Sequence, residues 1–100
     1  MIEVELRIPD GGSTEAVVRA VERACLANDL TRTLKGTLAS HRGSVHWHFK
    51  KGRQTGTLEI TWWETGRHLW FKVAGNRASQ RIQDMIPRLK EQIEGSFDKR

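Results

Sequence analysis

Two histidines flank a tryptophan in the stretch "HWH", where His46 and His48 stand two residues apart. In an extended strand this spacing puts both imidazoles on one face. Glu59 or His68, across neighbouring strands, would complete a ligand set that is chemically adequate for zinc. Strand alternation also brings two such residues to one face by chance, and Lys72 is a ready ion-pair partner for Glu59. The sequence therefore predicts no metal and no cofactor, and His46, His48 and Glu59 are retained as metal-ligand candidates.

The same part of the chain combines aromatic and basic residues. Residues 44–73 contain all four tryptophans. Residues 30–83 contain ten Lys or Arg against two Glu, a net charge of +8 in a chain whose total is +5. Between Asp29 and Glu59 there is no acidic residue, so a positive field over this segment should attract anions. The cations expected to contact a polyanion are Lys50, Lys51, Arg53, Lys72, Arg77 and Arg81.

The sequence carries no signature of an enzyme. It has no Gly-rich phosphate loop, no Ser or Cys nucleophile with an evident base and no paired carboxylates in a recognisable setting. The lone Cys25 excludes an intramolecular disulfide and is expected to be a small buried apolar residue. No apolar run approaches the roughly 20 residues of a membrane-spanning helix, and the N-terminus does not resemble a signal peptide. We expect a non-enzymatic cytoplasmic protein without a membrane partner.

Hydrophobic periodicity predicts the elements that must position these residues. In chain order they are a strand at 2–8, a helix at 14–28 capped by Ser13 or Thr14, strands at 44–50, 57–63 and 68–73, and a helix from Asn76 to about Gly95. The turns "KGRQTG" and "ETGR" separate the last three strands. Residues 30–43 suit either an edge strand or a helical turn and are treated as a connection. Pro87 is expected to kink or restart the last helix.

The resulting order, β-α-β-β-β-α, predicts one α+β domain over residues 1–100. We expect a two-layer sandwich in which both helices pack on one face of an antiparallel meander. Strand alternation assigns to the helix-covered core Val45, Trp47, Phe49, Leu58, Ile60, Trp62, Leu69, Phe71 and Val73. The open face then receives His46, His48, Lys50, Thr57, Glu59, Thr61, Trp63, His68, Trp70 and Lys72.

Regular hairpins would place Trp63 opposite His68, Thr61 between His46 and Trp70, and Glu59 between His48 and Lys72 on this open face. Both tryptophans would then stand in water. An exposed pair of this kind predicts a contact surface, so Trp63, Trp70 and His68 are expected to stack on bases or to seal an interface with another subunit.

The basic residues are expected at one end of the sheet. The turn "KKGRQTG", the end of the last strand and the start of the final helix all lie there, and a helix N-terminus favours anions. With "KKGRQTG" and "GNRASQRIQ" in these places, residues 14–94 resemble the double-stranded-RNA-binding domain in topology. That family grips RNA backbone with its first hairpin loop, its first helix and the N-terminus of its last helix. The chain lacks the family's Gly-Pro-His loop signature and Lys-rich helix start, and an extra strand precedes the first helix.

These patterns together predict a small binding module whose partner is nucleic acid, either RNA or a single strand, or another polyanion. The alternative is a homodimeric or protein-interaction domain in which the open sheet face is buried and the charge serves solubility. A third hypothesis is that the chain is a metal-binding protein that uses the His-x-His motif.

Overall fold

The computed structural model describes residues 1–53 and 56–97. Its elements are β1 (Ile2–Leu6), α1 (Thr14–Ala27), β2 (Leu30–Gly36), β3 (Val45–Lys51), β4 (Leu58–Trp63), β5 (His68–Val73), the 3-10 helix η1 (Arg77–Ser79) and α2 (Gln80–Gly95). The predicted order of elements is confirmed, and the connection at residues 30–43 contributes the additional strand β2. Gln54 and Thr55, in the predicted "KGRQTG" turn, lie outside the described residues.

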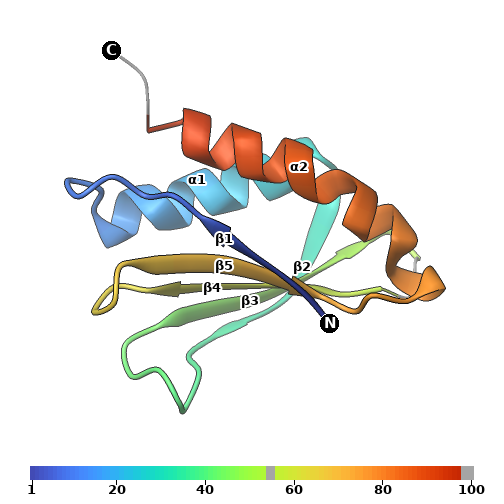
Figure 1. Ribbon diagram of the computed structural model, residues 1–100, viewed down its shortest axis with the longest axis horizontal. Coiled ribbons are helices and arrows are strands. Elements are labelled where there is room, and N and C mark those ends of the chain that lie inside the picture. The colour runs from blue at the N-terminus through green and yellow to red at the C-terminus, as the bar shows by residue number, and fades with distance from the viewer. Residues whose placement is uncertain (54–55, 98–100) are drawn as a thin grey trace.

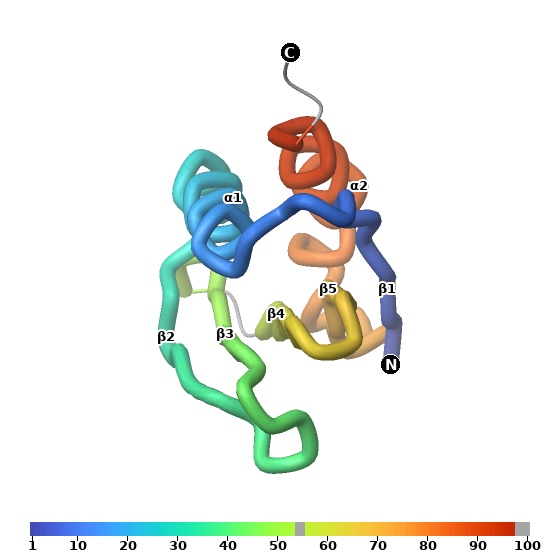
Figure 2. Tube along the Cα trace, turned by 90° about the vertical axis from the view of Figure 1, so that its left-hand side faces the viewer, coloured from blue at the N-terminus to red at the C-terminus, as the bar shows by residue number. Residues whose placement is uncertain are grey.

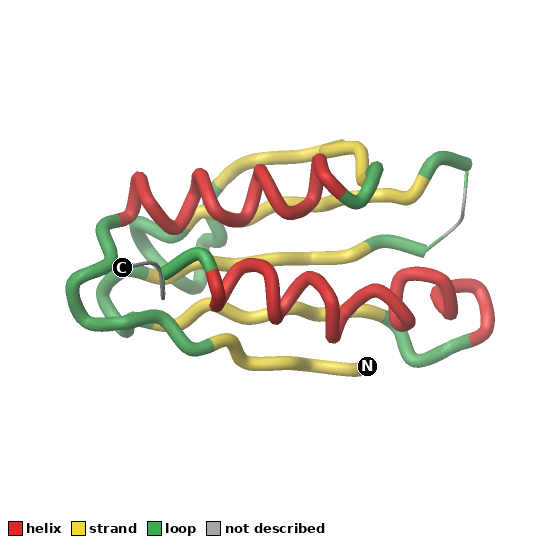
Figure 3. The backbone as a smooth tube through the Cα atoms, turned by 90° about the horizontal axis from the view of Figure 1, so that it is seen from above, coloured by secondary structure: helices red, strands yellow, loops and turns green. Residues whose placement is uncertain are grey.

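The fold has two layers, as predicted. A five-stranded antiparallel sheet in the order β1-β5-β4-β3-β2 forms one layer. Both helices lie on the same face of this sheet (Figure 1), and the view from above shows them side by side over the strands (Figure 3). In residues 1–53 and 56–97, no helix covers the other face of the sheet.

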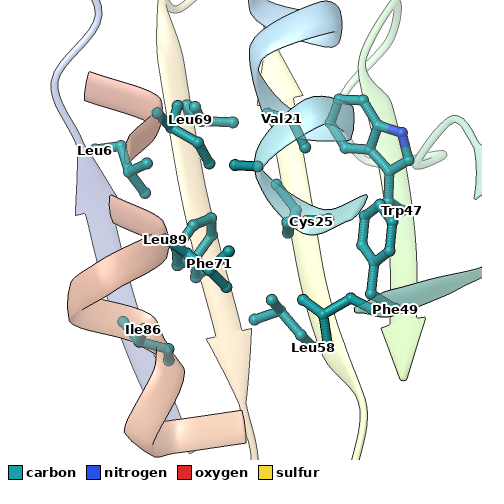
Figure 4. Packing of buried hydrophobic residues seen from close by; sticks show 14 of the residues in the cluster. Leu6, Val21, Cys25, Trp47, Phe49, Leu58, Leu69, Phe71, Ile86 and Leu89 are labelled. Atoms are coloured by element: carbon teal, nitrogen blue, oxygen red, sulfur yellow. The ribbon is translucent and has the colours of Figure 1, made fainter. Parts of the chain in front are cut away.

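The core lies between the helices and the sheet (Figure 4). The core residues predicted from strand alternation are buried, apart from Val45, which is half-buried. Trp47 and Trp62 are fully buried, and each indole N–H has an acceptor: Trp47 Nε1 donates to Glu22 Oε2 at 3.0 Å, and Trp62 Nε1 to Thr14 Oγ1 at 3.0 Å. These two tryptophans are therefore packing residues, fully buried and with the N–H hydrogen-bonded, as is usual for a buried indole.

The helix ends follow the predicted capping residues. Ser13 Oγ accepts from Ala16 N at the start of α1, and Asn76 Oδ1 accepts from Ser79 N in η1. The expected restart at Pro87 does not occur, since α2 continues through it as one helix. Pro87 is exposed, so the Gln83 carbonyl that loses its helical donor can be hydrated.

A bulge in β2 explains why the sequence pattern did not decide between an edge strand and a helical turn for this segment. Arg32 pairs with Phe49 but Leu34 pairs with His48, so the register shifts between Arg32 and Leu34. Leu30 is consequently buried beside the helices whereas Leu34 is 44% exposed. The bulge breaks the period of two by which a strand is recognised.

The loop at residues 37–44 leaves the sheet on the side away from the helices, as the end-on view shows (Figure 2). Backbone hydrogen bonds from His41 N to Leu38 O at 3.1 Å and from Ser44 N to His41 O at 3.0 Å fold it into consecutive turns. The open face is therefore bordered by a folded loop on its β2–β3 side.

Cys25 is buried, as predicted, and desolvation raises the pKa of its thiol to about 12, with a further rise from the charge of Glu22. Such a thiol is almost never a thiolate near neutral pH, so it is a packing residue. In the described part of the chain, no helix has the length and apolar character needed to cross a membrane.

Candidate functional site

The open face carries a cluster of three metal-ligand types from β3 and β4. His46 Nε2 lies 3.0 Å from His48 Nε2 and 3.7 Å from Glu59 Oε1. One ligand atom from each of the three residues lies within 4.8 Å of the others. The cross-strand register that brings them together, with His48 opposite Glu59 and His46 opposite Thr61, is the register predicted from the sequence.

His46 is the fixed member of this cluster. Its side chain is nearly buried, and its Nδ1 lies 2.7 Å from Thr61 Oγ1, so only Nε2 faces His48 and Glu59. Burial lowers the pKa of His46, and the neighbouring His48 and Lys72 lower it further, while Glu59 raises it. The imidazole is therefore held neutral, the form in which its Nε2 lone pair can accept a proton or a metal ion.

The tryptophans of the open face are partly covered, contrary to the expectation that they stand in water. His41, in the loop at 37–44, lies edge-on to Trp63 with ring centroids 4.9 Å apart and 5.4 Å from Trp70. Trp63 Nε1 also donates to Arg42 O at 3.3 Å. Trp63 and Trp70 are half-buried as a result. The predicted pairing of Trp63 with His68 is confirmed, and their rings are parallel at 6.5 Å.

The cations predicted to bind a polyanion are divided between two surfaces. Lys50 and Lys72 lie on the open face, where Lys72 Nζ is 3.9 Å from Glu3. Lys51 and Arg81 lie on the helix side and line one open pocket, together with Arg88. The structure thus brings two of the six into one pocket and separates Lys50 and Lys72 from them.

This pocket lies between the C-terminus of α1 and the first turns of α2. Lys51 Nζ donates to Asn28 O at 3.0 Å and is 3.8 Å from Asp29. Asp29 and Asp84 also line the pocket, which therefore holds three cations against two carboxylates. Arg81 and Arg88 form no ion pair with any residue in the described ranges.

Arg53 and Arg77 flank the same end of the sheet. The loop that carries Arg53 meets η1, since a Cβ added at Gly56 would lie 2.9 Å from Ser79 Cα. Both arginines are exposed and, among the residues that the structure describes, neither forms an ion pair. We call Lys51, Arg53, Arg77, Arg81 and Arg88 the basic end.

The basic end and the tryptophans do not form one surface. Trp63 ends β4, whereas the basic end lies beyond Leu58 at the start of that strand. The two positions are roughly 17 Å apart along the strand, from a rise of about 3.3 Å per residue. A ligand bound at the basic end can reach Trp63 only if it also extends along the sheet to the other end of β4.

Sequence reasoning missed three residues that belong to these sites. Thr61 was placed beside His46, but its hydrogen bond to that imidazole was not foreseen. Arg88 lies two helical turns after Arg81, a spacing that puts both on one face of α2. His41 was expected to be a surface residue or an extra metal ligand, and its packing against Trp63 and Trp70 was not foreseen, because it depends on an irregular loop.

The chain matches no protein-family model, no curated protein and no solved structure in the comparisons with known proteins. The function is therefore argued from the geometry alone.

Proposed function

We propose that this protein is a small non-enzymatic binding module that holds a nucleic acid or a similar polyanion on the basic end. The observation that carries the proposal is the pocket in which Lys51, Arg81 and Arg88 converge, flanked by Arg53 and Arg77. The four arginines form no ion pair among the described residues and keep most of their field in solvent, and a phosphate chain that binds them releases its own counterions.

The distribution of these cations favours an extended ligand. The cations of the basic end come from four places, the end of β3, the β3–β4 loop, η1 and α2, so they spread along the end of the sheet. Asp29 and Asp84 lower the positive potential inside the pocket. Arg53 and Arg77, the group outside the pocket, must therefore supply the rest of the attraction for an anion. A chain of successive phosphates can contact both groups, whereas a single small anion can contact only one.

The proposal assigns no specificity to the tryptophans. His41 packs against both Trp63 and Trp70, so the loop at 37–44 already occupies part of the surface that a base would need for stacking. Contacts to phosphate alone carry little sequence information, so we expect binding to depend on charge and strand type more than on sequence.

Salt dependence tests the proposal. Fluorescence anisotropy of labelled single-stranded DNA, single-stranded RNA and duplex RNA would be measured against protein at several salt concentrations. We expect affinity to fall steeply with salt, because each neutralised phosphate contributes a slope of roughly −0.7 to −0.9 in log K against log salt. Replacing Arg53→Ala and Arg77→Ala together should flatten that slope by about two units.

A matched control separates a site from a general charge effect. Arg19→Ala/Arg23→Ala also removes two exposed arginines, but from the side of α1 that faces a different groove, and should leave the slope unchanged. Equal weakening by the two double variants, or binding that does not change with salt, would show that the basic end is not the site.

A further inference from the structure

The geometry points to a site for one divalent transition-metal ion, with Zn²⁺ as the best fit, formed by His46 Nε2, His48 Nε2 and a Glu59 carboxylate oxygen. This inference does not depend on the proposed polyanion function, because the three ligands lie on the open face and none of them belongs to the basic end.

The spacing of the ligand atoms suits tetrahedral zinc. With bonds of about 2.0–2.1 Å to zinc, two ligand atoms of a tetrahedron are about 3.3 Å apart. The His46–His48 separation of 3.0 Å and the His46–Glu59 separation of 3.7 Å lie on either side of that value. One ligand atom from each of the three residues lies within 4.8 Å of the others, and the Glu59 side chain is 36% exposed and can turn to bring its carboxylate closer.

The residues around His46 orient it as a ligand. A metal-bound histidine usually gives its second ring N–H to a fixed acceptor, which sets the tautomer and the direction of the lone pair. Thr61 Oγ1, 2.7 Å from His46 Nδ1 and buried, is such a partner. His46 also lies on β3, which is paired on both sides by β2 and β4, so its backbone is already in position.

The charges around the cluster permit a cation. The sequence suggested that Lys72 would neutralise Glu59, but among the described residues Lys72 forms its ion pair with Glu3, at 3.9 Å. Glu59 instead lies beside His46. Lys72 is still close enough to lower the pKa of His46. Its positive charge will therefore weaken the binding of a metal ion without preventing it. Three protein ligands leave a fourth position for water or for a donor from a partner.

Direct titration with metal tests the inference. The protein, prepared without a polyhistidine tag and treated with chelator, would be titrated with ZnCl₂ by calorimetry and with CoCl₂ by visible absorption. We expect one ion per chain and the absorption of a four-coordinate Co²⁺ site. His48→Asn and Glu59→Gln should each weaken binding by at least roughly tenfold, since even residues that only orient a ligand contribute that much.

The second His–Glu pair on the sheet provides the control. His68 Nδ1 is 2.7 Å from Glu5 Oε2 and outside the cluster, so His68→Asn should bind zinc as the unchanged protein does. Circular dichroism would verify that each variant is folded. Glu59→Gln should disturb the fold least, because the Glu59 side chain is partly exposed. Absence of zinc binding, or equal binding by the unchanged protein, His48→Asn and Glu59→Gln, would overturn the inference. A loss with His68→Asn as large as with His48→Asn would also overturn it.

Discussion

His46 is the residue at which the open face meets the core. Only 8% of it is exposed, and it contacts Thr61 on one side and His48 and Glu59 on the other. Burial is the main cause of its lowered pKa, followed by His48; Glu59 opposes the shift and Lys72 adds to it. A buried neutral imidazole makes the stability of the whole domain depend on pH.

The sign of that dependence follows from the direction of the shift. In the unfolded chain a histidine has a pKa of about 6.5. The folded chain keeps His46 neutral to a lower pH, so between the two pKa values the unfolded state binds more protons. The stability contributed by neutral His46 is therefore fully present above the unfolded pKa and is lost as the pH falls towards the folded pKa.

We expect the free energy of unfolding in urea to decrease as the pH falls below about 6.5. The titration would be done with chelator present, since bound metal would change the protonation of the cluster. His46→Asn should be less stable near neutral pH but should show a smaller decrease over the same range. An identical decrease in both proteins would assign the effect to other groups; carboxylates with ordinary pKa values titrate below this window.

The sequence placed the right side chains on the open face but could not give their distances. Strand alternation alone predicts that His46, His48 and Glu59 share a face, and hairpin register predicts which residues are opposite. Whether two imidazoles meet at 3.0 Å depends on side-chain rotamers, which the backbone pattern does not fix. The pairing of Lys72 with Glu3 was not foreseen because the sequence did not predict that β1 lies beside β5.

The elements that could be predicted from the sequence are those with a regular hydrophobic pattern. β3, β4 and β5 bury the residues that a period of two predicts, and the structure begins and ends each of them within about a residue of the expected bounds. β2 was missed as a definite strand because its bulge exchanges the two faces after Arg32. The loop at 37–44 has no turn signature that would fix its path, so its packing over Trp63 and Trp70 could not be predicted.

α2 contains a proline, Pro87, which disfavours the α-helical conformation. Pro87 lies in the middle of the helix, removes one backbone hydrogen bond and crowds the preceding turn. The helix persists because one stripe of α2 is buried against the core, namely Ile82, Ile86, Leu89 and Ile93.

We expect Pro87→Ala to stabilise the protein by about 1–2 kcal/mol, because the gain of a helical hydrogen bond exceeds the increased freedom of the unfolded chain. Urea unfolding would measure it. Glu91→Ala, at another exposed position of α2, should change stability by no more than about 0.5 kcal/mol. A destabilised Pro87→Ala protein would mean that the packing of α2 requires the proline itself.

For the whole molecule, the question is whether the open face binds another copy of the chain. In the described residues, the large apolar side chains that are exposed are Met1, Ile2, Leu26 and Leu34. Ile2 is on β1 and Leu34 on β2, the two opposite edges of the sheet, and Leu26 is on α1. The edge strands also carry charges, Glu3 and Glu5 on one and Arg32 and Lys35 on the other, which oppose the pairing of either edge with its own copy in a second chain. These features favour a monomer.

We therefore expect light scattering to give the monomer mass of 11.5 kDa at micromolar concentration, at both low and high salt. A stable dimer needs roughly 1,200–2,000 Å² of buried surface, and scattered single apolar residues do not supply its core. The half-buried Trp63 and Trp70 should give the same emission at every protein concentration. A dimer mass that persists at high salt, with emission that shifts to the red in Trp63→Ser as the mass halves, would show instead that the open face is an assembly surface. In that case the basic end would still be tested separately by the Arg53→Ala/Arg77→Ala variant, because those arginines lie at the far end of the sheet from Trp63.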